Sequence, residues 1–118
     1  MAKINYEIKV ERAYSGPIER VEDLFAADDL DNIGLHKAEE IKRRIGAWDE
    51  WAWCYVDVVA TCGPSDCVTS IGPCSFDSLE DFAKSYEYKN MQRDARKFLI
   101  EDLKEAAAAY EYLLTLKD

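Results

Sequence analysis

Apolar and polar residues alternate strictly over residues 4–10 of this 118-residue chain. The apolar positions of this segment are Ile4, Tyr6, Ile8 and Val10. A period of two is typical of a β-strand that is buried on one side only. The pattern therefore predicts a half-buried first strand.

Two more strands are predicted over residues 51–61 and 67–72. The loop between them, residues 62–66, reads CGPSD and consists mainly of turn-forming residues. A loop this short joins antiparallel neighbours, so the two strands are expected to form a hairpin. The even-numbered residues of the first of these strands are small or β-branched. This side of the strand is therefore expected to lie close against a helix.

Two short helices are predicted before the hairpin. Pro17 suits the first turn of a helix over residues 18–25, in which the apolar residues form one stripe. A second helix is predicted over residues 32–45, with Asn32 as its N-cap and Gly46 as a left-handed stop.

A short helix and then a long one are predicted after the hairpin. Ser78, with Asp81 three residues later, resembles a capping arrangement and indicates a helix through about Ser85. The long helix is expected over residues 89–116. Its predicted buried stripe consists of Met91, Ala95, Phe98, Leu99, Leu103, Ala106, Tyr110, Leu113 and Leu114.

These elements predict an α+β fold in a single domain, residues 1–118. We expect a small antiparallel sheet of about three strands packed against a long C-terminal helix, with two or three shorter helices. A chain of 118 residues is long enough for one core and too short for two well-formed ones. Hydrophobic residues make up 48% of it, which is enough for folding despite a formal net charge of -9.

The negative charge is concentrated in one segment. Residues 49–87 carry eight acidic side chains and one basic side chain, whereas residues 88–118 carry six of each. Binding to phosphate backbones requires Lys and Arg, so no direct nucleic-acid ligand is expected. No apolar run approaches the roughly 20 residues that cross a bilayer, and residues 1–10 do not resemble a secretory signal. We therefore expect a cytoplasmic protein without membrane contact.

Four aromatic residues fall within a short stretch around the start of the hairpin. Three of them are expected on one side of the strand, together with one acidic residue. In one interpretation the rings belong to the core, as Trp residues usually do. In the other they form an exposed patch with acidic neighbours, since Trp and Tyr dominate binding hot spots. The predicted partner-binding patch consists of Trp48, Asp49, Glu50, Trp51, Trp53, Tyr55 and Asp57.

All four cysteines lie in the hairpin segment. Their spacing, Cys54-x7-Cys62-x4-Cys67-x6-Cys74, lacks the close pairs that are typical of structural zinc. In the predicted hairpin Cys62 faces Cys67 at the loop end, and Cys74 lies near Cys54 at the other end. This arrangement gives two separate pairs, and no metal or cofactor is expected. A Cys62–Cys67 disulfide is geometrically open but disfavoured in the cytosol.

The sequence contains no catalytic signature. The only histidine, His36, lies off the apolar stripe of its helix among acidic residues and is interpreted as a surface residue. Residues 29–40 imitate a calcium-binding loop, but Ile33 stands where a side-chain oxygen is required. Residues 49–83 contain no base that could lower the pKa of a cysteine. The chain is therefore expected not to be an enzyme.

The stretch DEWAWCYVDVVATCG (residues 49–63), followed by GPCSFDSLEDF (residues 72–82), resembles small uncharacterised acidic proteins of phages and other mobile elements. In those proteins an acidic Trp-Ala-Trp strand leads through a short loop into a Cys-Ser-aromatic motif and an acidic helix. The resemblance implies a compact accessory protein, several classes of which block host defences by occupying surfaces meant for nucleic acid. It implies no catalytic residue.

Two functions are therefore considered. The first is a non-enzymatic acidic binding protein of phage or mobile-element origin that engages a host protein in the host cytoplasm, as an anti-defence inhibitor or a nucleic-acid mimic. A basic, nucleic-acid-handling protein is one candidate partner, because a focused negative field steers encounter with a positive groove. The alternative is a small enzyme or metal-dependent accessory protein that uses the Cys54–Cys74 cluster. Monomer and homodimer are both open.

Overall fold

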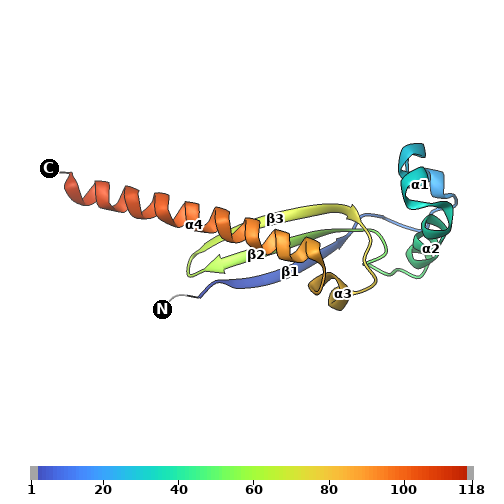
Figure 1. Ribbon diagram of the computed structural model, residues 1–118, viewed down its shortest axis with the longest axis horizontal. Helices are drawn as coiled ribbons and strands as arrows, with labels where there is room; N and C mark the ends of the chain where they lie inside the picture. The colour runs from blue at the N-terminus through green and yellow to red at the C-terminus, as the bar shows by residue number, and fades with distance from the viewer. Residues whose placement is uncertain (1–2, 117–118) are drawn as a thin grey trace. The chain divides into compact units, whose positions relative to one another are not determined.

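The chain forms a three-stranded antiparallel sheet packed against a long C-terminal helix, together with shorter helices (Figure 1). The computed structural model describes residues 3–116. The predicted α+β fold is confirmed. Across the described residues, no helix combines the length and the apolarity that crossing a bilayer requires.

The sheet has the strand order β1-β2-β3, with β2 in the centre. Strand β1 spans Asn5–Arg12, β2 spans Cys54–Cys62 and β3 spans Ser65–Cys74. Strand β2 begins later than predicted, because residues 50–53 form a turn and a bend. Strand β3 is longer at both ends than predicted, and the hairpin loop shortens to residues 63–64. Gly63 has a φ of 60° there, which glycine adopts without strain.

One side of β2 is fully buried from Cys54 to Ala60, as its sequence pattern predicted. The fully buried side chains on this side are Cys54, Val56, Val58 and Ala60, each with 0% exposure. Ala52, two residues before the strand, also has 0% exposure. Cys62, at the end of the strand, is half-buried. Small and β-branched side chains allow a neighbouring element to pack closely on this side.

The chain folds as two compact units. The first, which we call the α4 unit, consists of Met1–Lys9, Asp57–Ser70 and Ser85–Asp118. The second, which we call the Trp53 unit, consists of Val10–Val56 and Ile71–Lys84. All three strands contribute residues to both units.

In the α4 unit, the long helix packs on the sheet through small and apolar side chains. Helix α4 spans Tyr86–Thr115, and Ser85 caps its start by accepting a hydrogen bond from the backbone N–H of Tyr88 at 3.2 Å. Ala60 of β2 forms a buried cluster with Ala95 and Leu99 of α4. Partly buried side chains complete this cluster: Ile4, Tyr6, Cys62, Cys67 and Leu103.

Only the first half of the predicted α4 stripe is buried. Met91, Ala95 and Leu99 are buried and Leu103 is half-buried. The prediction was wrong for Phe98, which lies about 100° around the helix from the buried Leu99 and is exposed. It was also wrong for four exposed residues in the C-terminal part of α4: Ala106, Tyr110, Leu113 and Leu114. A helix of 30 residues is about 45 Å long, whereas a strand of ten residues is about 33 Å long. Helical periodicity shows which side chains share a side but not how far the facing sheet extends.

The helices of the Trp53 unit differ from the predicted ones. A single 3-10 turn, η1 (Val21–Asp23), forms where a helix over residues 18–25 was predicted. Helix α1 spans Ala27–Ile33 and α2 spans Leu35–Gly46. Gly34, with a φ of 89°, separates the two helices. The predicted helix over residues 32–45 therefore starts only after this break, and Asn32 lies inside α1 and is not its N-cap.

The Trp53 unit contains an apolar core and an aromatic cluster. The buried residues of the core are Val21, Phe25, Ala38, Ile41, Ile45 and Ala52. The aromatic cluster consists of Trp51, Phe76 and Phe82, with ring centroids 4.8–6.3 Å apart. Phe82 lies on α3 (Leu79–Ala83), whose predicted N-cap is confirmed, because Ser78 accepts a hydrogen bond from the backbone N–H of Asp81 at 3.2 Å.

The burial of α4 predicts a large loss of stability for one leucine variant and almost none for another. Leu99→Ala should lower the free energy of unfolding by about 2–5 kcal/mol, because it leaves a cavity at a fully buried position. Leu113→Ala should change it by less than about 0.5 kcal/mol, because this side chain is 62% exposed. Urea unfolding followed by circular dichroism measures both values. Equal losses of stability in the two variants would contradict the observation that the core reaches Leu99 but not Leu113.

Candidate functional site

The residues of the predicted partner-binding patch lie in different surroundings. All but Asp57 belong to the Trp53 unit, and Asp57 belongs to the α4 unit. Strand β2 begins at Cys54, so the predicted alternation does not extend to Trp51 and Trp53. The contacts of each residue therefore decide whether its side chain belongs to the core or to the surface.

Trp51 is a core residue. Its side chain is 8% exposed and packs against the rings of Phe76 and Phe82. Its backbone carbonyl accepts a hydrogen bond from the N–H of Phe76 at 3.0 Å. Trp51 therefore belongs to the core and not to an exposed binding patch.

Trp53 is half-buried and is shared between the core and the surface. Its ring meets that of Phe25 edge to face, with centroids 4.8 Å apart, and it packs against the core of the Trp53 unit. Its backbone carbonyl accepts a hydrogen bond from the N–H of Ala13 at 2.9 Å. The backbone and one side of the ring are therefore fixed, while part of the ring remains accessible.

The accessible part of Trp53 lines a groove of about 490 Å³, which we call the Trp53 groove. Apolar side chains from α1, α2 and β3 form much of its surface, and Asp29 and Lys37 contribute one charge of each sign. The full lining consists of Phe25, Asp29, Ile33, Lys37, Ile41, Trp53, Pro73, Cys74 and Ser75. Apart from Trp53, none of these residues was part of the predicted patch.

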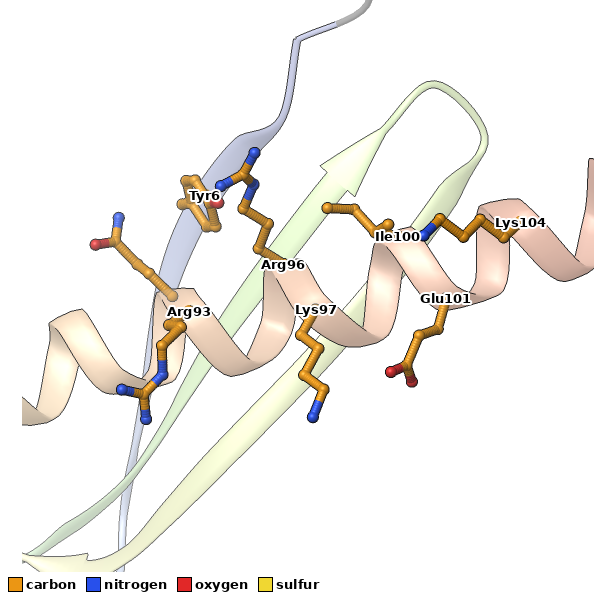
Figure 2. Close-up of a pocket in the computed structure, with 8 residues that line it drawn as sticks. Tyr6, Arg93, Arg96, Lys97, Ile100, Glu101 and Lys104 are labelled. Carbon is orange, nitrogen blue, oxygen red and sulfur yellow. The ribbon is translucent and has the colours of Figure 1, made fainter.

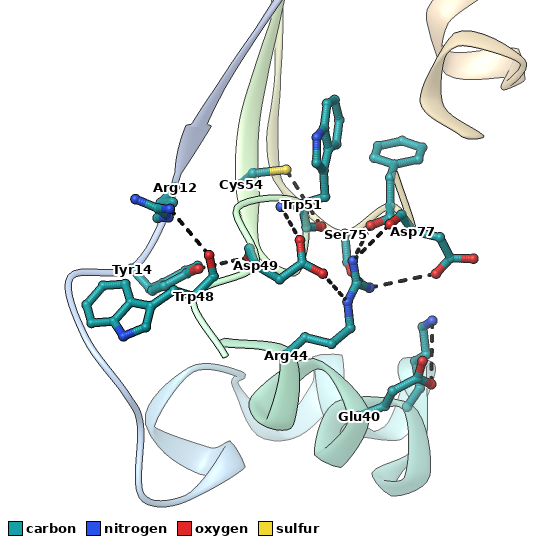
Figure 3. A network of polar contacts seen from close by, with 12 residues as sticks. Arg12, Tyr14, Glu40, Arg44, Trp48, Asp49, Trp51, Cys54, Ser75 and Asp77 are labelled. Atoms are coloured by element: carbon teal, nitrogen blue, oxygen red, sulfur yellow. Dashed lines mark hydrogen bonds and ion pairs between the residues drawn. The ribbon is translucent and has the colours of Figure 1, made fainter. Parts of the chain in front are cut away.

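Arg44 organises the backbone next to this groove (Figure 3). Its side chain is only 15% exposed, and its Nε donates to a carboxylate oxygen of Asp49 at 2.8 Å. Its Nη2 donates to the backbone carbonyl of Phe76 at 2.6 Å, and its Nη1 lies 3.7 Å from the carboxylate of Asp77. One guanidinium thus joins the end of α2 to the nearby Asp49 and to residues 76–77, a segment that is distant in sequence. No pattern in the sequence indicated this role.

Asp49 is a structural acid. Besides binding Arg44, its carboxylate accepts a hydrogen bond from the backbone N–H of Trp51 at 3.0 Å. Its backbone carbonyl accepts a hydrogen bond from the hydroxyl of Tyr14 at 2.8 Å. These contacts make Asp49 unsuitable as a free rim charge. By contrast, Glu50 is exposed, and Asp57 accepts a hydrogen bond from the hydroxyl of Ser70 at 2.6 Å in the α4 unit.

Trp48, two residues after the end of α2, has a left-handed backbone conformation. Its φ is 60°, whereas Gly46, which was predicted to be the left-handed stop, is the last residue of the helix. A non-glycine residue in this conformation costs roughly 1–2 kcal/mol, so its neighbours must hold it. The Arg12 guanidinium lies 5.8 Å from the centre of the ring and donates to the Trp48 carbonyl at 3.3 Å. The ring of Tyr14 lies 6.1 Å away.

Tyr55 is 47% exposed and lies against the backbone of β3. A Cβ atom at Gly72 would approach the Tyr55 ring to 2.8 Å and the carbonyl oxygen of Cys54 to 2.9 Å. Gly72 also has a φ of 138°, so both the space and the backbone conformation favour glycine. Tyr55 thus has a fixed position and an exposed ring.

The cysteines form the two separate pairs that were predicted. In the Trp53 unit, the thiols of Cys54 and Cys74 each donate to the other's backbone carbonyl at 3.5 Å. In the α4 unit, Cys62 and Cys67 pack on the same cluster, and the thiol of Cys67 donates to Asp102 at 3.2 Å. Within residues 3–116, no three His, Cys, Asp or Glu side chains are grouped as a metal site would require.

The surroundings of Cys54 keep its thiol protonated. The hydrogen bond with Cys74 raises the pKa of Cys54 far above its ordinary value, and burial raises it further. Desolvation and the neighbouring Asp102 carboxylate raise the pKa of Cys67 as well. A thiol with a raised pKa is a poor nucleophile and a poor metal ligand, because both roles need the thiolate.

The excess negative charge belongs mainly to the Trp53 unit. This unit has 14 acidic and 7 basic residues, a net of −7, whereas the α4 unit has 10 acidic and 8 basic residues. The chain as a whole carries -9. Three of the acids lie on α1 with no base between them: Asp28, Asp29 and Asp31. The Trp53 groove therefore lies in a strongly negative unit.

Comparisons with protein-family models, with curated proteins and with solved structures find no match.

The contacts of Arg44 predict a stability effect. Arg44→Ala should lower the free energy of unfolding by about 2–3 kcal/mol, because it leaves the partly buried carbonyl of Phe76 and one carboxylate oxygen of Asp49 without their donor. Arg43→Ala, at the exposed neighbouring position, is the matched control and should have little effect. Chemical denaturation measures both. Equal stability of the two variants would contradict the structural role of Arg44.

The surroundings of Cys54 predict slow thiol chemistry. In the native protein Cys54 should react with a maleimide much more slowly than Cys62, because Cys54 is fully buried and its pKa is raised. Raising the pH to about 9, the ordinary pKa of a cysteine thiol, should not remove this difference. Peptide mass spectrometry after timed labelling gives both rates. Rapid labelling of Cys54 would show that its side of β2 is accessible.

Proposed function

We propose that this chain is a non-enzymatic binding protein that engages a basic segment of a partner protein through the Trp53 groove. The observation that carries the proposal is the half-buried Trp53 ring, which lines an apolar groove in the strongly negative unit. The proposal keeps one ring of the predicted patch and replaces the rest of that patch with groove residues.

The groove suits an apolar anchor side chain. Its volume of about 490 Å³ lies within the range of about 300–1,000 Å³ that is typical of ligand pockets. Ile33, Ile41 and Phe25 offer apolar contacts beside the Trp53 ring. Binding hot spots are centred on such aromatic side chains because their contacts exclude water. Trp53 is already held in place by Phe25, so little side-chain entropy is lost on binding.

The charge of the Trp53 unit favours a basic partner. A net charge of −7 on one unit attracts positively charged surfaces and raises the rate of encounter. Asp29 lines the groove itself, so a Lys or Arg next to the anchor side chain would find an acidic neighbour there. A partner segment with an apolar residue between basic residues would therefore match both properties.

The resemblance to acidic proteins of phages and mobile elements supplies a biological context. In that context the partner is a host protein in the host cytoplasm, and the role is inhibition of a defence function or mimicry of nucleic acid. The acidic surface supports mimicry, since a protein that binds phosphate backbones is itself basic. The raised pKa of Cys54 supports a binding role over thiol catalysis.

Defined peptides test the proposal directly. A panel in which Leu, Phe or Trp is flanked by Lys and Arg should bind, and a panel with the same residues flanked by Glu should not. Asp29→Lys should weaken binding more than Asp31→Lys, because both are exposed acids of α1 but only Asp29 lines the groove. Trp53→Ala should cost on the order of 2 kcal/mol or more of binding free energy.

Tryptophan fluorescence gives the affinities, and NMR chemical shifts locate the bound peptide. Circular dichroism of each variant separates loss of binding from loss of folding. Binding that is equally sensitive to Asp29→Lys and Asp31→Lys, or shifts confined to residues outside the groove, would contradict the proposal.

A further inference from the structure

The C-terminal half of α4 carries large apolar side chains that are exposed: Tyr110 is 64% exposed and Leu114 is 68% exposed. They belong to a longer row along one side of the helix, which we call the α4 seam. The seam consists of Arg96, Ile100, Leu103, Ala107, Tyr110 and Leu114. Its spacings alternate between four and three residues, which is the pattern of helices that pack against each other along their length.

A groove of about 610 Å³ lies beside the first part of this seam, within the α4 unit. Figure 2 shows Arg96, Ile100 and Lys104 following α4, with Tyr6 of β1 beside Arg96. Basic side chains dominate the lining, which contains four bases, Arg93, Arg96, Lys97 and Lys104, and one acid, Glu101. The first part of the seam therefore offers a basic groove, and the last part offers exposed apolar side chains next to Glu111.

We propose that two copies of this chain form a two-fold dimer in which their α4 seams pack antiparallel. With the axis at the level of Glu105, Ile100 lies opposite Tyr110 of the second copy, and Leu103 lies opposite Ala107. The aliphatic stem of Arg96 lies opposite Leu114. Large side chains thus meet smaller or flexible ones along about 27 Å of helix, the length of 18 residues.

Two opposite-charge contacts beside the seam favour this antiparallel register, against one like-charge approach of the two Lys104 side chains near the axis. Lys97 and Glu111 flank the seam on the same side of α4, because they are 14 residues apart, which is two heptads. In an antiparallel pair each Lys97 lies near Glu111 of the second copy, so the contact occurs twice. In a parallel pair Lys97 would instead lie near Gln92 of the second copy, and Glu111 near Ala106, so neither would find an opposite charge. Opposite charges at these positions select the antiparallel arrangement.

A second copy fits the seam because the seam is complementary to itself. Its residues are spaced symmetrically about the level of Glu105, which is what a two-fold interface requires. Ala107, which lies on the seam, and Ala106 beside it allow close approach of the two helices near this axis. The dimer is independent of the Trp53 groove, because the seam lies wholly in the α4 unit.

Charge exchange tests the register on the full chain. Sedimentation equilibrium of the parent over a wide range of concentrations should show a monomer–dimer equilibrium. Lys97→Glu alone and Glu111→Lys alone should each raise the dimer dissociation constant about tenfold or more, because like charges replace both opposite-charge contacts. The double variant should regain the parent constant. An equimolar mixture of the two single variants should form heterodimers.

Glu105→Lys is the matched control, because Glu105 is exposed on the opposite side of α4 and should leave the dissociation constant nearly unchanged. Leu114→Asp should weaken the dimer while leaving the circular dichroism spectrum of the monomer unchanged, since this side chain is exposed. A parent that stays monomeric at all concentrations would overturn the proposal. So would a dimer that is insensitive to Lys97→Glu, or a double variant that does not recover.

Discussion

The central strand β2 has one side that is fully buried over most of its length. From Ala52 to Ala60, every second side chain is fully buried, and each is small or β-branched. In the α4 unit this allows Ala95 and Leu99 of α4 to pack directly on Ala60. In the Trp53 unit, Ala52 joins the core formed by η1 and α2. A larger side chain on this side of β2 would have no space in either cluster.

The position of the Trp53 groove follows from this packing. Residues 50–53, just before β2, form a turn and a bend. This bend places Trp51 in the aromatic cluster and leaves part of the Trp53 ring accessible. Arg44 and Asp49 hold that turn against the end of α2 and the segment after β3. The accessible ring is therefore supported by partly buried contacts. Such pre-organisation is what a binding site needs to retain its geometry without a partner.

The main elements could be predicted because they depend on local periodicity. The alternation around Ile8, the small side of β2 and the Ser78 cap each follow from a few neighbouring residues. The break at Gly34, the left-handed Trp48 and the exposed end of α4 could not be predicted, because each depends on contacts or on the extent of a facing element. The groove was missed for the same reason. It combines Ile33 and Pro73, which are distant in sequence and share no pattern.

The central claim is that the Trp53 groove contacts a basic protein partner. It is tested most directly by a photo-crosslinking amino acid placed at Lys37, which lines the groove. The same amino acid placed at Lys9, an exposed residue of β1 in the α4 unit, serves as the control. On irradiation in cells that contain this protein, the account predicts that position 37 crosslinks to a basic protein and that Asp29→Lys abolishes this product. Equal crosslinking of the same protein from both positions would contradict the account.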